Sequence, residues 1–507
     1  MDARIEPGQA RSLSHKEARL TMDAPTAYLD HKETRLIVCG VLLPLFMGSI
    51  DNTILASALP TIGHDFGDVR GLPWLITIYL LAATAAMPLY GKVADIHGRR
   101  FALYVAIALH MAGSLVCALA PTMFVLILGR ALQGLGGSGL SAVSVIVLGD
   151  AAAPKDRGRY YAYFSIVYTT AGACGPALGG FIADKLHWSL VFWLNIPMGL
   201  CALLITATIL RRLPRNERPH RLDVIGAILI VTASVAFMLG LNFGGKTYSW
   251  LSAPVLALFA AALVVGTAFV WRLLTAPEPL IPIAILTDPI VRWSVIANSF
   301  GWSAIIGLNI FLPIYLQSVI GLSPTSAGLS LMVLMMSLNS SAGLCGQVLG
   351  RVTHYKILPM IMLVIAIAAV GVLALWADRM TILSFQVLLF LIGAGFGPVP
   401  SLCMVALQNA VARHQLGIAV GTLAFSRNFF ATILVAFLGV IVLTVTSSLA
   451  PGDTGAFGGA LPPAAAEAAE AFRRVFLVAA GCFLVAFVAL VLIEEKPLRT
   501  AGAEERP

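Results

Sequence analysis

The sequence predicts an all-helical integral membrane protein, and two observations lead to this class. Of its 507 residues 59% are hydrophobic and only 11% are charged, whereas soluble domains carry about 25% charged residues. Apolar stretches of about twenty residues, the length that crosses a bilayer as a helix, recur between residues 36 and 493. So few charges cannot cover a water-exposed surface. The composition therefore excludes a secreted protein, a soluble enzyme and, despite the net charge of +8, a nucleic-acid-binding protein.

Charged residues and Pro/Gly punctuation divide the apolar stretches into fourteen spans. In order, they are 36–58, 74–90, 101–120, 123–149, 160–183, 189–210, 222–243, 254–274, 293–319, 325–349, 357–376, 381–410, 417–446 and 475–493. Tryptophans typical of the membrane interface lie at or near span ends, namely Trp74, Trp188, Trp250, Trp271, Trp293 and Trp376. We expect a loop over 447–474, with a short surface helix near 464–472.

The basic residues predict which side each loop faces. With the N-terminal tail placed inside, 25 of the 33 Lys and Arg lie in inside segments and 6 in outside loops. Two more, Arg130 and Arg427, lie within spans. Cytoplasmic loops carry the excess of Lys and Arg in membrane proteins, so both termini are expected in the cytoplasm and the number of spans is even.

A basic stretch divides the spans into groups. Five arginines lie within residues 211–221, between the sixth and seventh spans. The simplest division is a cytoplasmic tail (1–35), a six-helix bundle (36–212), two inserted helices with their loops (213–291), a second six-helix bundle (292–493) and a C-terminal cytoplasmic tail (494–507). The loops GKVADIHGRR (91–100) and GQVLGRVTHYK (346–356) follow the second helix of each bundle, as an internal repeat would require.

Several motifs resemble those of one transporter family. GKVADIHGRR is similar to the loop motif of the major facilitator superfamily, GRALQGLGGSG (129–139) to its fourth-helix motif and GPALGG (175–180) to its fifth-helix antiporter motif. The segments DNTILASALPTI (51–62), WLNIPMG (193–199), LPIYLQSVIGLSPTSAG (312–328) and GTLAFSRN (421–428) narrow the resemblance to the fourteen-helix drug:proton antiporters. It implies the major facilitator fold of two six-helix bundles, here with two inserted helices.

Asp51 is the one acidic residue well inside a span. An ionised carboxylate in hydrocarbon is costly, so it must be paired, hydrated or protonated. We interpret it as the proton-binding group; a structural residue that fixes the helix is the alternative.

Helix geometry predicts a partner for Asp51. At 1.5 Å per residue, Asp51 and Arg130 lie at a similar depth in antiparallel helices, and Gln133 shares a helix face with Arg130. The resemblance likewise implies that Arg130 and Gln133 take part in proton coupling. A static ion pair between two helices is the alternative.

Arg427 lies about 15 Å into its span, with no acidic residue buried in its own half of the chain. It needs a carbonyl group, water, Asp51 or an anionic substrate, so we interpret it as a substrate-binding or gating residue; a hydrogen-bonded helix lock is the alternative. Asn52, Asn309 and Gln317 are uncharged polar residues in spans. We expect them to line the substrate cavity with Arg427.

A second set of residues is expected to gate the transporter. The loop motif supplies Gly91, Asp95, Gly98, Arg99 and Arg100, which with Lys92 can form a cytoplasmic latch. A plain positive-inside signal would explain the bases but not Asp95 or the glycines. Small residues permit close helix approach and a proline permits a bend, which suits helix movement or merely static packing; the set is Gly175, Pro176, Gly179 and Gly180.

The sequence therefore predicts a proton-coupled secondary transporter that exports amphiphilic drugs or related compounds by alternating access. The expected partners are protons, a small-molecule substrate and the lipid bilayer of the cell membrane (the inner membrane in a Gram-negative source); the protein is expected to be a monomer without cofactor or metal. The runner-up is a carrier for one defined metabolite, such as a basic amino acid, a siderophore or an organic anion. A membrane enzyme or receptor is less favoured, because no nucleotide-binding, HExxH or GxSxG motif occurs.

Overall fold

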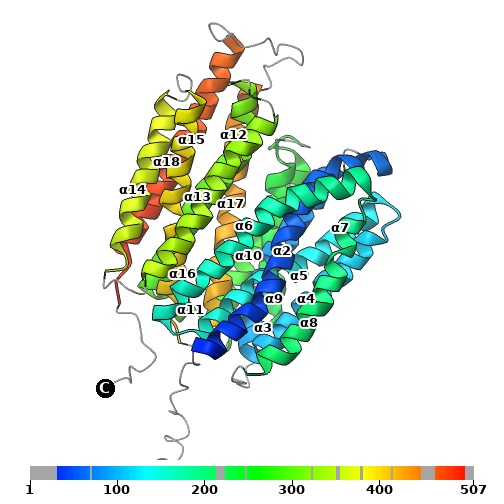
Figure 1. The fold of residues 1–507 in the computed structure, drawn as a ribbon, viewed down its shortest axis with the longest axis vertical. Coiled ribbons are helices and arrows are strands. Elements are labelled where there is room, and N and C mark those ends of the chain that lie inside the picture. The colour runs from blue at the N-terminus through cyan, green and yellow to red at the C-terminus, as the bar shows by residue number, and fades with distance from the viewer. Residues whose placement is uncertain are drawn as a thin grey trace, which may run out of the picture.

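The structure is a computed structural model that describes residues 31–496 except 69–70, 213–222, 246–247, 321, 323, 350–353, 377–380, 413–414 and 447–462. The described chain is almost entirely helical (Figure 1) and contains 14 helical spans long and apolar enough to cross a membrane. The prediction of fourteen membrane-spanning helices is thereby confirmed.

The helices follow one another in the order predicted. They are α2 His31–Phe66, α3 Leu72–His97, α4 Arg99–Ala118, α5 Met123–Ala151, α6 Pro154–Lys185, α7 Leu190–Trp193, α8 Asn195–Ile209, the 3₁₀ turn η1 Leu210–Arg212, α9 Val224–Phe243, α10 Ala253–Thr275, α11 Ile283–Thr287, α12 Pro289–Ser318, α13 Pro324–Leu349, α14 Ile357–Trp376, α15 Ile382–Phe396, α16 Pro398–Ala410, α17 Leu416–Thr446 and α18 Pro463–Leu492.

Several elements differ from the predicted spans. Helix α2 continues to Phe66, past the predicted end at residue 58, and the sixth and twelfth spans are each divided, at Leu194 and at Gly397. The expected separate surface helix over 464–472 is wrong, because α18 runs without a break from Pro463 into the last span. The alanine-rich sequence before that span favours continuation of the helix.

Local chemistry explains several helix starts. The side chains of Thr122, Asp223, Asp288 and Thr381 accept hydrogen bonds from backbone amides in the first turns of α5, α9, α12 and α15. Such N-caps satisfy donors that have no partner within the helix. Gly98 separates α3 from α4 with φ of +87°, a backbone conformation that glycine adopts without strain.

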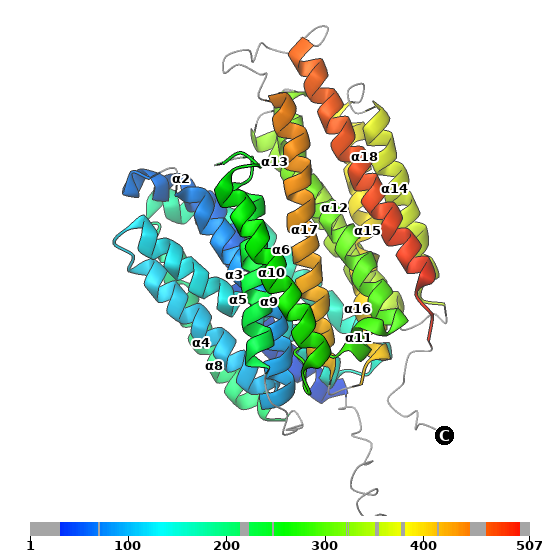
Figure 2. The ribbon, with the colours of Figure 1, turned by 180° about the vertical axis from the view of Figure 1, so that it is seen from behind.

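The helices form two groups, α2–α8 and α12–α18, that lie side by side and diverge toward one end of the molecule (Figures 1 and 2). We call the end at which α2 begins and the described chain finishes, at the bottom of Figure 1, the basal end, and the opposite end the apical end. The C-terminal group has its own apolar core. The inserted helices α9 and α10 pack on each other, and α9 also contacts α3 and α17.

The two groups make their closest contacts near the basal end. Gly91 of α3 packs against Gly417 of α17, and Gly158 of α6 packs against Gly346 of α13. A Cβ atom at any of these four positions would collide with the backbone of the facing helix. Glycine is therefore needed for the backbones to approach this closely.

Candidate functional site

Asp51 occupies the middle of α2 and is only 1% exposed. Its Oδ2 atom lies 2.5 Å from Nη1 of Arg130 on α5. Its Oδ1 atom accepts hydrogen bonds from Asn195 Nδ2 on α8, at 3.0 Å, and from Gln133 Nε2 on α5, at 3.2 Å. Three helices thus converge on one carboxylate, and we call these four residues the Asp51 centre.

Arg130 is equally buried, with 1% of its surface exposed, and both Nε and Nη1 of its guanidinium donate hydrogen bonds. Nε donates to the backbone carbonyl of Leu75 on α3, at 3.1 Å, and Nη1 also donates to Gln133 Oε1, at 2.8 Å. The group lies over the ring of Tyr79, 4.4 Å from its centroid. A charge removed from water is stable only with partners of this kind, and here they also fix its orientation.

The contact between Asp51 and Arg130 agrees with their expected depth, and Gln133 joins them as expected. Sequence reasoning missed Asn195 as a ligand of the carboxylate, although it lies in the quoted segment WLNIPMG. It also missed Tyr79 and Ser114; the Ser114 hydroxyl accepts from Gln133 Nε2 at 2.7 Å. Of these three residues, only Asn195 lies in a motif quoted from the sequence. Nothing marked the other two, because an uncharged polar residue in a span does not require a charged partner.

His110 on α4 adjoins the Asp51 centre and was also missed. The ring is fully buried and its Nδ1 atom lies 3.2 Å from the backbone oxygen of Gln133. Its Nε2 atom has no hydrogen-bond partner among the described residues. The packing is tight, since a Cβ atom at Gly136 of α5 would collide with the backbone of α4 at His110.

Arg427 on α17 has surroundings unlike those expected for it. Its guanidinium lies over the ring of Trp302 on α12, 4.9 Å from the centroid, and Nε has no hydrogen-bond partner among the described residues. No carboxylate of the described chain forms an ion pair with it, Asp51 included. Sequence reasoning did not consider an aromatic partner, although a cation is attracted to the face of tryptophan.

The uncharged residues expected around the substrate give less information. Asn309 on α12 is partly buried, and its amide donates a long contact of 3.5 Å to the sulfur of Met335 on α13. The side chains of Asn52 and Gln317 lie outside the described residues. None of the three is placed at the Asp51 centre by a described contact.

At the basal end, Asp95 of α3 connects the two helix groups. Its carboxylate accepts hydrogen bonds from the backbone amides of Gly417, at 3.2 Å, and Ile418, at 2.9 Å, in the first turn of α17. Arg99 lies between two carboxylates, with Nη2 3.0 Å from Asp95 and Nε 2.5 Å from Asp150. A negative group at a helix N-terminus is favourable, so this contact holds the groups together.

Arg100 and Gly98 were expected to take part in the same latch as Asp95, and the structure shows other surroundings for them. Arg100 donates to the Tyr104 hydroxyl, at 2.9 Å, and to the carbonyl of Ala207 on α8, at 3.2 Å. These contacts remain within the N-terminal group, so a part for Arg100 in the latch stays a prediction. Gly98 provides the turn described above and makes no close contact of its own.

The fifth-helix glycines differ among themselves. Gly175 and Gly179 of α6 pack directly on α2, next to Thr53 and Ile54. A Cβ atom at Gly180 would meet nothing within 4 Å, so the expected close packing is absent at this described position, and a gating role for Gly180 stays a prediction. The side chain of Pro176 lies outside the described residues.

The described residues contain no group of three or more His, Cys, Asp or Glu side chains that could hold a metal ion. A carboxylate whose partners are one cation and two amides can exchange its ionic contact for a proton.

Comparison with known proteins agrees with this architecture. The family model of the Major Facilitator Superfamily matches residues 41–436. The chain is 31% identical over 445 residues to "Multidrug resistance protein 3" of Bacillus subtilis, covering 87% of this chain and 85% of the relative. It is 30% identical over 412 residues to "Multidrug transporter protein MdtP" of the same species, with 80% and 75% covered.

A solved structure gives the same fold. The proton:xylose symporter XylE superposes with a TM-score of 0.63 at 13% identity, over 93% of this chain and 98% of that chain. The helices, the membrane-spanning lengths and the family match together identify a multi-pass membrane protein whose relatives are transporters. The chain belongs to the Major Facilitator Superfamily.

Proposed function

We propose that the protein is a proton-coupled exporter of amphiphilic organic compounds. The observation that carries this proposal is the Asp51 centre, a fully buried carboxylate 2.5 Å from a fully buried arginine. The relatives named as multidrug transporters support the same substrate class.

In the proposed mechanism the proton competes with Arg130 for Asp51. Protonation removes the charge that attracts Arg130, so the link between α2 and α5 weakens and Arg130 keeps only its neutral partners. Release of the proton restores the ion pair. The centre therefore has two states that differ in charge, which is what coupling to a proton gradient requires.

Alternating access is proposed to use the basal contacts as its latch. For the basal end to open, α17 must leave the Asp95 carboxylate, and the two glycine contacts must separate. We propose that the bundles 36–212 and 292–493 move as units around the substrate, and that α9 and α10 travel with the helices they contact.

The basal end is proposed to face the cytoplasm, as the distribution of Lys and Arg favours. Helix α10 offers a matched test, because Leu251 lies just before it and Thr275 at its end, both exposed. In a cysteine-free background, a membrane-impermeant maleimide should label Leu251→Cys in intact cells, and Thr275→Cys only after lysis. The reverse pattern would overturn the orientation.

A second candidate substrate class is an organic anion, favoured by one observation. The Nε atom of Arg427 is buried without a hydrogen-bond partner in the described chain, and no described carboxylate neutralises this arginine. A carboxylate or sulfonate on the substrate would supply both a hydrogen-bond acceptor for Nε and a negative charge for the guanidinium. Uptake of matched neutral and anionic compounds distinguishes this class from neutral or cationic substrates.

The decisive experiment for proton coupling replaces Asp51 with asparagine. The asparagine amide is nearly isosteric with the carboxylate and keeps hydrogen-bonding capacity, but it cannot bind and release a proton at physiological pH. In proteoliposomes, Asp51→Asn should abolish accumulation driven by an imposed pH gradient, while substrate counterflow continues. Undiminished uphill transport by the variant would contradict the proposal, and loss of both activities together would assign Asp51 to folding or substrate binding instead.

A further inference from the structure

A cavity of about 500 Å³ lies between the inserted helices and the C-terminal group. Its walls come from the last turns of α9, from Gly244 and Trp250 in the loop after it, from α12 and from α17. All three helices contribute residues near their apical ends, and α2 and α5 contribute none. The cavity is thus separate from the Asp51 centre.

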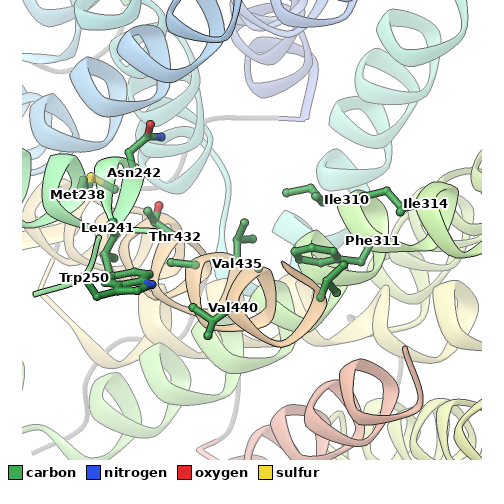
Figure 3. A pocket seen from close by; sticks show the side chains of 14 residues that line it. Met238, Leu241, Asn242, Trp250, Ile310, Phe311, Ile314, Thr432, Val435 and Val440 are labelled. Atoms are coloured by element: carbon green, nitrogen blue, oxygen red, sulfur yellow. The ribbon is translucent and has the colours of Figure 1, made fainter. Parts of the chain in front are cut away.

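The lining of the cavity is mostly apolar, and its polar groups are gathered at one end, which we call the polar end. Figure 3 shows Asn242, Thr432 and Trp250 grouped with the apolar Met238 and Leu241 at the end formed by α9 and the loop after it, while Ile310, Phe311 and Ile314 of α12 form the opposite end. Valine side chains of α17 lie between the two ends.

The polar end can both donate and accept hydrogen bonds. Thr432 uses its hydrogen on the carbonyl of Asn428, at 3.0 Å, which leaves the hydroxyl oxygen as an acceptor. Within the described chain, the Asn242 amide donates a long bond of 3.5 Å to the Thr77 hydroxyl on α3. Trp250 adds an indole N–H donor.

The uncharged lining of this cavity indicates what kind of molecule it can bind. No Asp, Glu, Lys, Arg or His is among the described residues that line it, so an ion placed there would lose its hydration without gaining a counterion. The volume falls within the range of pockets that hold drug-sized molecules. The lining therefore fits an uncharged molecule with an extended apolar body and one polar group.

We propose that this cavity is a binding site for uncharged amphipathic molecules, whose polar group contacts Asn242, Thr432 and Trp250 and whose apolar body lies against α12 and α17. The site depends on the inserted helix α9 for one wall. It does not rest on proton coupling or on export, because it is defined by equilibrium binding.

The test uses N-phenyl-1-naphthylamine, a neutral fluorescent amine with a single N–H donor, added to the purified full-length protein in lipid nanodiscs. Gly439→Phe should fill the cavity, because a Cβ atom at Gly439 meets only the Phe311 ring edge, at 4.0 Å. The matched control is Gly371→Phe on α14, where a Cβ atom meets nothing within 4 Å. We expect at least a tenfold loss of affinity in the first variant and less than a twofold change in the second.

The polar end has its own matched pair. Thr432 and Thr267 both donate to the carbonyl four residues earlier in their helices, at 3.0 and 2.8 Å, so replacing either with valine removes the same local bond. Only Thr432→Val removes an acceptor from the cavity. It should weaken dye binding about fivefold, the effect of one hydrogen bond, whereas Thr267→Val should not.

Three results would overturn the proposal. The first is equal dye affinity in wild type and in a folded cavity-filling variant, with Val435→Trp as a second such variant if Gly439→Phe does not fold. The second is that 1-anilinonaphthalene-8-sulfonate, the same skeleton with a negative charge, loses affinity in Gly439→Phe as much as the neutral dye does. The third concerns lipid. Brominated acyl chains would quench the fluorescence of Trp250, which is obtained as the difference between wild type and Trp250→Phe, and the neutral dye would not relieve this quenching. That result would assign the cavity to lipid.

Discussion

Arg130 and Arg427 are two arginines within membrane-spanning helices, and they have opposite surroundings. Arg130 contacts a carboxylate, a backbone carbonyl, an amide and a tyrosine ring. Arg427 lies on a tryptophan ring, and its Nε atom has no hydrogen-bond partner among the described residues. The first is held by the protein in a single geometry, whereas the second retains capacity to bind another group.

We propose from this difference that the N-terminal group handles the proton and the C-terminal group handles the substrate. In the N-terminal group the positive charge is already neutralised, so a proton can act there without a substrate. In the C-terminal group the positive charge lacks a carboxylate in the described chain, so a ligand can act there without a proton. Substitutions at the two positions should therefore differ in kind as well as in size.

Arg130→Gln is expected to have the largest effect. It leaves Asp51 buried without a cation, and breaking a buried pair from one side costs about 3–5 kcal/mol. The thermal stability of the purified variant should fall accordingly. The pH of half-maximal transport should rise, because a carboxylate without its cation releases a proton less readily.

Arg130→Lys serves as the control for this prediction. It keeps the charge but loses the planar fork that reaches Leu75 and Gln133 together. The wild-type pH profile should return in part, with incomplete recovery of stability. An unshifted profile in Arg130→Gln would show that the two residues act separately.

The double-mutant cycle of Asp51→Asn and Arg130→Gln should show strong coupling. Residues in direct contact commonly have interaction energies of 0.5–3 kcal/mol, and this fully buried pair should lie near the upper limit, about 3 kcal/mol. The interaction energy is obtained from the unfolding free energies of wild type, the two single variants and the double variant, all measured in the same detergent. The same cycle with Arg427→Gln in place of Arg130→Gln should give additive effects, and coupling there would contradict the separation of the two sites.

Asn195→Leu should have an intermediate effect. It removes a donor 3.0 Å from Asp51 Oδ1 and leaves Gln133 as the remaining amide there. Loss of a hydrogen bond to a buried charged group costs about 2 kcal/mol. Asn309→Leu is the matched control, because that amide contacts only a methionine sulfur at 3.5 Å in the described chain. Equal destabilisation by the two substitutions would deny Asn195 a part in holding the carboxylate.

Arg427→Gln is expected to change stability least, by about 1 kcal/mol, because Arg427 is only partly buried and its contact with the Trp302 ring is worth about that much. Its effect should instead appear in specificity, as reduced transport of anionic compounds with neutral compounds unchanged. A stability loss as large as that of Arg130→Gln would show that Arg427 is a structural lock.

What could be read in advance depended on charge and on regular geometry. The spans and the approach of Asp51 to Arg130 were predictable because hydrocarbon tolerates few charges and a helix rises by a constant amount per residue. The positions of Asn195 and His110 were not, because an uncharged polar side chain does not demand a particular partner. Trp302 was missed for a related reason, since aromatic residues in a span look like ordinary apolar packing.

Helix ends and glycines were the least predictable features. The continuation of α18 to Pro463 depends on local helix propensity beyond the membrane, which hydropathy does not report. Gly180 could not be distinguished from Gly179, because the sequence does not show which face of α6 meets α2.

Helix α17 carries three features that were described separately. It starts at the amides bound by Asp95, holds Arg427 in its first half and lines the apical cavity through Thr432 and the residues that follow. It runs for 31 residues without a proline, a rod of about 46 Å. We propose that such a rod moves as a unit, so that a ligand that tilts its apical end would also move its basal end against the Asp95 carboxylate. Binding in the apical cavity and opening of the Asp95 contact would then be two effects of one movement of α17.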